Sequence, residues 1–282
     1  MAVSVSIINM KGGVGKTTLA FNLAGYAAYD RRLKVLLVDL DPQANLSQYV
    51  LGRKGYKKLL DDYSPTVFDV FEQFTPVARK NKAPNKIEPQ EVIIKARPHW
   101  GSSQGCIDLI PSRLELFWTL RNPTGKEHLL ARFIGSISEE YDLILIDCAP
   151  TESILTTSAY LSSDHVVVPV KPEFLAAIGL PLLVRSLELF KQSYEDQRIE
   201  MAGIVFNDAR DNPEHDLSRS EVKDYASRQG WYVFQHEIKH SDSYPRGART
   251  STPISRTDYA RWTVTKAFRD FGAEFIGRVG LP

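Results

Sequence analysis

The chain has 282 residues and an almost balanced charge, with 35 Lys plus Arg against 34 Asp plus Glu. This balance excludes a uniformly basic surface, so any contact with nucleic acid must come from a local patch. The length allows one large α/β domain or two small ones with a substantial core. Cys106 and Cys148 lack metal or redox spacing, and neither a leader nor an apolar run of roughly 18 to 20 residues is present. We therefore expect a cytoplasmic location and no membrane span.

Short apolar runs alternate with amphipathic stretches along the chain. This pattern predicts an α/β fold in which a mainly parallel, twisted sheet carries helices on both faces. Strands are expected at residues 3–8, 34–39, 107–110, 143–147, 165–170, 201–206 and 232–234. Helices are expected at 16–29, 124–137, 180–194 and 216–229. A last helix from about Thr257 as N-cap would bury a stripe of Tyr259, Trp262, Ala267, Phe271 and Phe275.

Residues 52–105 fit this rhythm poorly and are expected to be a surface insertion in a single domain over 1–282. Weak periodicity predicts a short helix at 67–74, followed by a long surface excursion at 76–105. Its basic residues are Arg79, Lys80, Lys82, Lys86, Lys95 and Arg97, with Trp100 beside them. They could contact DNA or an acidic partner, or form an ordinary solvated loop.

Residues 10–18, Met-Lys-Gly-Gly-Val-Gly-Lys-Thr-Thr, lie between an apolar strand and a helix. Glycines let such a loop curl so that its N–H groups point at phosphate oxygens, and the helix adds its positive end. Lys16 would bridge the outer phosphates and Thr17 would hold Mg²⁺. A glycine-rich turn with solvated lysines is the alternative, but the strand–loop–helix context favours a nucleotide site.

The loop departs from the ordinary pattern at its start, where Met10 replaces a glycine and Lys11 adds a second ammonium. Two neighbouring ammonium groups repel each other unless phosphate compensates both, so Lys11 expects a phosphate that another subunit could hold. The sequence KGGVGKTT resembles the deviant Walker A loop of the ParA/MinD family of P-loop ATPases. The resemblance implies that Lys11 reaches across an ATP-sandwich homodimer. The residues expected to contact ATP or ADP in the loop are Lys11, Gly12, Gly13, Val14, Gly15, Lys16, Thr17 and Thr18.

Two further apolar strands end in carboxylates at the edge where ligands collect in open α/β sheets. Asp39 and Asp41 end the run VLLVDLDPQ, and Asp147 ends the run YDLILIDCAP. Asp147 is expected to hold Mg²⁺ through water, and Asp39 to support that site from behind. The family's D-x-D-P-Q element implies that Asp41 is critical for hydrolysis.

Other matches extend the resemblance over most of the chain. Residues 168–180 resemble the family segment V-P-x-x-P-E-x-x-A-x-x-G, which includes Glu173 and Gly179. Asn207 matches a strand-terminal asparagine that reads adenine, and its amide can both donate and accept. Residues 238–243 and 253–254 resemble the loop that covers adenine.

The resemblance is strongest to ParA-type, Soj-like partition and cargo-positioning ATPases. Lys11, Lys16 and Asp41 would support slow ATP hydrolysis. With slow hydrolysis, an ATP-bound dimer would stay on a surface until a partner speeds turnover and releases it. That surface is expected to be DNA, bound without sequence preference, which would associate the protein with the nucleoid. The expected contacts are Arg210, Lys239, His240, Arg246 and Arg249.

No room for an N-terminal helix-turn-helix is expected before the first strand, so targeting would come from a ParB-like adaptor. A MinD-like membrane ATPase is one alternative, but the tail after Phe275 is short and poor in basic residues. A metabolic or electron-transfer relative that uses the same loop is another alternative, although Cys148 is badly placed to bridge a cluster.

Overall fold

The computed structural model describes residues 1–74, 87–96, 105–174 and 176–282. Their strands form one eight-stranded sheet in the order β3-β4-β2-β5-β1-β6-β7-β8. The strands are β1 Val3–Ile7, β2 Lys34–Leu40, β3 Ile94–Ala96, β4 Cys106–Ile110, β5 Leu143–Cys148, β6 His165–Val170, β7 Glu200–Ala209 and β8 Ile238–Lys239. Only the β3–β4 pair is antiparallel among these strands. The mainly parallel sheet is confirmed.

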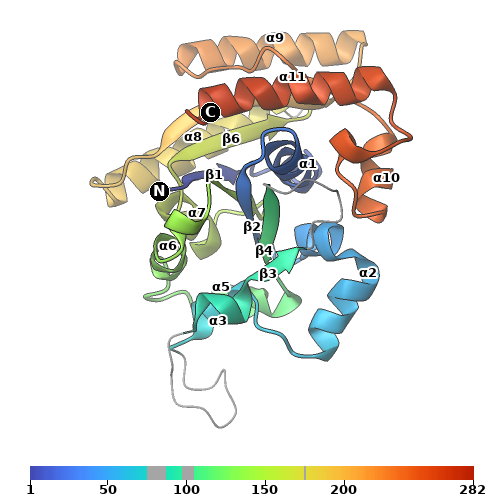
Figure 1. Cartoon of the computed structure of the whole chain (residues 1–282). Helices are drawn as coiled ribbons and strands as arrows, with labels where there is room; N and C mark the ends of the chain where they lie inside the picture. The colour runs from blue at the N-terminus through green and yellow to red at the C-terminus, as the bar shows by residue number, and fades with distance from the viewer. Residues whose placement is uncertain (75–86, 97–104, 175) are drawn as a thin grey trace.

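Helices cover both faces of the sheet, as the alternation along the chain predicts (Figure 1). They are α1 Lys16–Tyr29, α2 Asn45–Asp61, α3 Val67–Glu72, α4 Pro89–Val92, α5 Phe117–Arg121, α6 Leu129–Gly135, α7 Ile154–Leu161, α8 Ala176–Ser193, α9 Pro213–Arg228, α10 Ser243–Arg249 and α11 Trp262–Arg278. Short 3₁₀ turns include η1 Leu114–Leu116 and η3 Ile254–Arg256. Because the helical crossovers make consecutive strands parallel, the carboxyl ends of these strands lie at the same edge of the sheet.

The alternation within β2 explains the two cores. Val35 and Leu37 face the core that α1 and α11 cover, whereas Leu36 and Val38 face the core of α3, α6, α7 and α8. Successive strand residues point to opposite faces, so a strand that is apolar throughout needs cover on both sides. All four side chains are fully buried, and each such burial contributes roughly 1.5 to 3 kcal/mol.

The strand after α8 runs further than expected. β7 continues to Ala209, three residues beyond the predicted end, because β8 pairs with Asn207 and Ala209. The strand predicted at 232–234 is wrong: only an isolated bridge joins Val233 to Ile204 there.

The segment expected to be a surface excursion contains regular structure where it is described. The short helix near 67–74 is confirmed as α3, whereas α4 and β3 fall within 76–105 and correct the prediction of a continuous excursion. β3 forms because Ile94 to Ala96 add an edge strand to β4. Residues Arg79, Lys80, Lys82, Lys86, Arg97 and Trp100 lie outside the described residues.

Helix ends differ where tertiary contacts decide them. The helix predicted at 124–137 is only α6, because Lys126 in the preceding turn forms a buried ion pair with Glu72. The last helix starts at Trp262, with Arg261 rather than Thr257 at its N-cap, and Trp262 is 70% exposed. The expected burial holds for Phe271 and Phe275, which are fully buried.

Candidate functional site: a phosphate loop at the carboxyl edge of the sheet

The loop that follows β1 turns sharply into α1. Gly13 and Gly15 have φ angles of 76° and 84°, in the left-handed region that favours glycine. A Cβ at Gly15 would lie 2.2 Å from Nδ2 of Asn207, whereas one at Gly12 or Gly13 would meet no atom within 4 Å. The loop is therefore held tightly at its end and is open along its glycine-rich part, where a phosphate could approach the backbone.

Lys16 at the start of α1 is folded back onto this loop. Its Nζ donates to the carbonyl oxygens of Asn9 at 3.0 Å and Lys11 at 3.1 Å. Burial lowers the pKa of Lys16, and the neighbouring Asp147 opposes that shift. The hydrogen bonds of this ammonium within the described residues go to backbone carbonyls, and an anion would stabilise it further, which fits a phosphate ligand.

Asn9 organises the loop, and the sequence patterns did not single it out. Its Nδ2 donates to the carbonyl of Pro169 at 2.9 Å, and its Oδ1 accepts from the backbone N–H of Lys11 at 2.8 Å. Asn9 thus ties the loop to the end of β6. Its position directly after an apolar strand was the one signal that could have found it.

Asp147 lies at the end of β5 beside Asp39 of β2, and the two residues are in register. Both carboxylate oxygens of Asp147 are buried and have no hydrogen-bond partner among the described residues. Burial and the charge of Asp39 raise its pKa well above the usual value, while Thr17 and Lys16 oppose the shift. A divalent cation would supply the missing positive charge, so the residues present fit Mg²⁺.

No group of three or more His, Cys, Asp or Glu side chains suited to a metal occurs within the described ranges. An ion here would therefore depend on Thr17, Asp147, water and the phosphates of a nucleotide, which is the usual pattern for Mg²⁺.

The carboxylate of Asp39 forms hydrogen bonds that fix the start of α2. Its Oδ2 accepts from the backbone N–H of Ser47 at 2.8 Å and from Ser47 Oγ at 2.6 Å. Burial raises the pKa of Asp39 to about 7, and the hydrogen bonds from Ser47 moderate the shift. Its side chain is fully buried, so it would support Asp147 without contacting a bound ion itself.

Asp41 lies just beyond the end of β2 and is only partly buried. Its Oδ1 accepts from the backbone N–H of Gln43 at 2.9 Å, which shapes the turn before α2. It is therefore placed at the same edge as the loop but in a wetter environment than Asp39. Two carboxylates two residues apart thus have different surroundings, because Asp39 lies within β2 whereas Asp41 lies beyond its end.

Asn207 touches the loop from β7. Its Nδ2 donates to the carbonyl of Val14 at 2.7 Å. The segment expected to cover adenine also packs beside the loop's helix, since the N–H of Ile254 donates to Asn22 Oδ1 at 2.6 Å and Pro253 lies against Gly25. The loop, β7 and η3 are thus brought together around α1.

The basic residues expected to contact DNA fall in two places. Nη2 of Arg210 lies 3.3 Å from His240, and Lys239 is paired with Asp211 and with Glu237. The two arginines on α10 are Arg246, whose guanidinium stacks 4.0 Å from the ring centre of Tyr259, and Arg249, which is exposed. Lys239 is therefore less available for a phosphate than its exposure suggests.

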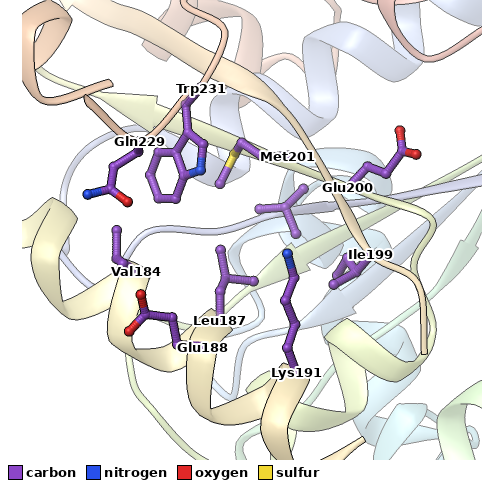
Figure 2. A pocket seen from close by; sticks show the side chains of 10 residues that line it. Val184, Leu187, Glu188, Lys191, Ile199, Glu200, Met201, Gln229 and Trp231 are labelled. Atoms are coloured by element: carbon purple, nitrogen blue, oxygen red, sulfur yellow. The ribbon is translucent and has the colours of Figure 1, made fainter. Parts of the chain in front are cut away.

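A separate cavity of about 170 Å³ lies at the opposite edge of the sheet, near the amino ends of β6 and β7. Figure 2 shows Leu187, Met201 and Trp231 facing it from α8, β7 and the turn after α9, with Glu188 and Lys191 also in its wall. It is remote from the carboxyl edge, so it is not part of the phosphate loop site.

Comparisons with known proteins agree with this geometry. The AAA_31 family, described as an AAA domain, matches residues 2–201. The chromosome partitioning protein ParA of Myxococcus xanthus is 32% identical over 235 residues, which are 81% of this chain and 73% of that protein.

Two solved structures share the fold. The McdA protein of Cyanothece, in a variant complex with ATP, is 20% identical with a TM-score of 0.76, covering 100% of this chain and 97% of its own. Cobyrinic acid a,c-diamide synthase of Mycobacterium smegmatis, with a bound ATP analogue and magnesium, is 25% identical with a TM-score of 0.72, covering 97% and 93%. The two-lysine loop, the sheet order and the family match together place the chain in the ParA-type ATPases, which have the P-loop NTPase fold.

Proposed function

We propose that this protein is an ATP-driven switch that forms an ATP-sandwich homodimer, binds DNA without sequence preference and slowly hydrolyses ATP. The observation that carries the proposal is the presence of both Lys11 and Lys16 on one glycine loop, beside the buried carboxylate of Asp147. Such an edge can bind a phosphate chain and a divalent cation at once. ATP and ADP would be the ligands.

Hydrolysis would depend on positioning more than on covalent chemistry. Thr17 would contact Mg²⁺ directly and Asp147 through water, and the ion would neutralise charge on the transferred phosphate. Lys16 would turn from the loop carbonyls to the outer phosphates. Asp41, at the wet end of β2, would orient the attacking water. None of the sequence motifs contains a residue expected to be a strong catalytic base, which fits slow ATP hydrolysis.

A homodimer would explain Lys11, because Lys16 of the same loop already serves the nucleotide bound by its own chain. Lys11 would contact the phosphates bound by the partner chain. Asn207 and the 253–254 segment would lie near adenine, and their contacts with the loop and with α1 support that assignment.

DNA would be bound through Arg210 together with Arg246 and Arg249, with a smaller part for Lys239. Such contacts would be to phosphates and so would weaken steeply with salt. The M. xanthus relative is named for chromosome partitioning, which supports a segregation or positioning role and a nucleoid location. A ParB-like adaptor or another stimulating partner would select the cargo and accelerate hydrolysis.

Two other functions use similar loops. A MinD-like ATPase would bind a membrane surface through an amphipathic segment; of the helices in the described ranges, none has the length and apolarity to cross a bilayer. A synthetase would act on a small molecule, and one solved neighbour is named as such. The ParA relative is the more identical of the two, which favours the partition reading.

The decisive experiment measures binding of duplex DNA by the Asp41→Ala protein with ATP, with ADP and without nucleotide, over a salt series. We expect tight, salt-sensitive binding with ATP only. Unchanged ATP hydrolysis by Asp41→Ala would contradict the role given to Asp41. ATP-driven dimers that ignore DNA in every state would instead direct the search to membranes and protein partners.

A further inference from the structure

Lys11 is held within its own chain by a carboxylate that follows β6. Its Nζ lies 3.3 Å from Oε2 of Glu173. The other oxygen of Glu173, Oε1, lies 2.7 Å from Nζ of Lys171. Glu173 therefore uses both carboxylate oxygens, one for each lysine.

The position of Glu173 is fixed from several sides. Lys171 also contacts Asp208 at 3.1 Å, and Asp208 in turn contacts Nδ1 of His240 at 2.6 Å. The backbone carbonyl of Glu173 accepts from Ser218 Oγ at 2.9 Å. The hydrogen bond from Lys171, followed by that from Lys11, lowers the pKa of Glu173, so the carboxylate is ionised at neutral pH. A charged and preorganised carboxylate thus faces Lys11.

We propose that Glu173 competes with nucleotide phosphate for Lys11, and that this competition sets the protein concentration at which ATP assembles the dimer. The inference rests on the proposed function, because it requires Lys11 to engage a phosphate of the partner chain. Each chain must break its Lys11–Glu173 contact before Lys11 can cross. Glu173 is therefore a positioning residue that favours the single chain.

The size of the effect follows from exposure. The side chains of Lys11 and Glu173 are 26% and 40% exposed, so their ion pair is weak, as measured surface pairs are. A dimer breaks two such pairs. We expect Glu173→Gln to lower the dimer dissociation constant by about two- to thirtyfold, from the range typical of exposed pairs.

The test uses sedimentation of the Asp41→Ala protein with ATP, alone and combined with Glu173→Gln. Glu115→Gln is the matched control, because Glu115 is 43% exposed and pairs with Arg113 at 2.8 Å outside the loop site. We expect tighter dimers with Glu173→Gln, no shift with Glu115→Gln, and an unchanged affinity of the single chain for a fluorescent ADP.

Weaker dimers or an unchanged constant with Glu173→Gln would overturn the inference while leaving the ATP dimer intact. No dimer in the parent and in the control would refute the proposed function, and the role of Glu173 with it. If the Gln variant does not fold, Glu173→Asp keeps the charge but shortens the reach to Lys11. It should also strengthen the dimer, by a smaller factor, and a loss of dimer would contradict the competition.

Discussion

Asp39 provides a test of how burial controls the charge of this site. Its folded-state pKa is about 7 against an ordinary value of 3.8, because the carboxyl group is fully buried. The native state therefore binds more protons than the unfolded chain between about pH 4 and 7. The free energy of unfolding therefore falls as the pH rises through this window, because the buried acid must ionise. A shift of roughly three units corresponds to a cost of about 4 kcal/mol above pH 7.

Asp39→Asn removes this cost but also loses one acceptor for the hydrogen bonds from Ser47 and Asp41, which costs about 1 to 3 kcal/mol at every pH. We therefore expect the stability of the variant relative to that of the parent to rise by about 2 to 3 kcal/mol between pH 5 and pH 8, so that the variant is the more stable protein at pH 8. The free energy of unfolding would be measured by urea denaturation without nucleotide and with a chelator of divalent ions.

The control is Asp61→Asn, because Asp61 is an exposed carboxylate paired with Lys57. It should change the free energy of unfolding by less than about 1 kcal/mol, with little pH dependence. An Asp39→Asn effect of the same size and sign at pH 5 and pH 8 would refute the argument that burial keeps this acid neutral.

Three further substitutions test the end of the phosphate loop, the buried Lys126–Glu72 pair and the carboxylate of Asp147. Gly15→Ala should destabilise the protein and abolish ATP binding, because its Cβ would overlap Asn207 and its φ is left-handed; thermal melts and titration with fluorescent ATP would measure both. Lys126→Met should reduce the free energy of unfolding by about 3 to 5 kcal/mol, because it removes one partner of a buried ion pair with Glu72. Asp147→Asn should raise apo stability at neutral pH but weaken the Mg²⁺ dependence of ATP binding, measured by calorimetry with and without Mg²⁺.

Each of these has a control and a contrary outcome. Gly12→Ala meets no atom within 4 Å, so it should preserve the fold, and equal melting of the two alanine variants would contradict the steric argument. Lys57→Met removes an exposed pair and should cost about 0.5 kcal/mol. A similarly small effect for Lys126→Met would mean that the buried pair adds little. An unaltered Mg²⁺ dependence of ATP binding in Asp147→Asn would show that Asp147 does not hold the metal.

Local sequence predicted the parts of the site that depend on one strand and the turn after it. The glycine loop lies between β1 and α1 as expected, since glycines at left-handed φ and a following helix are encoded within a few residues. Asp39 and Asp147 lie one residue before the ends of their strands, close to where the apolar runs predict. The predictions for residues 232–234 and 94–96 are wrong because edge strands depend on a neighbour far along the chain, not on their own periodicity.

Short-range spacing of glycine, lysine and apolar residues is enough to predict the α/β class and the position of the phosphate loop, and the motifs of the loop carry the resemblance to the family. Which charges meet depends on the folded chain. It placed Glu173 against Lys11, Asp39 behind Asp147, and Asn207 against the end of the loop. Ionic and hydrogen-bonding contacts act over a few ångströms, and it is the sheet order that brings residues more than a hundred positions apart within that range.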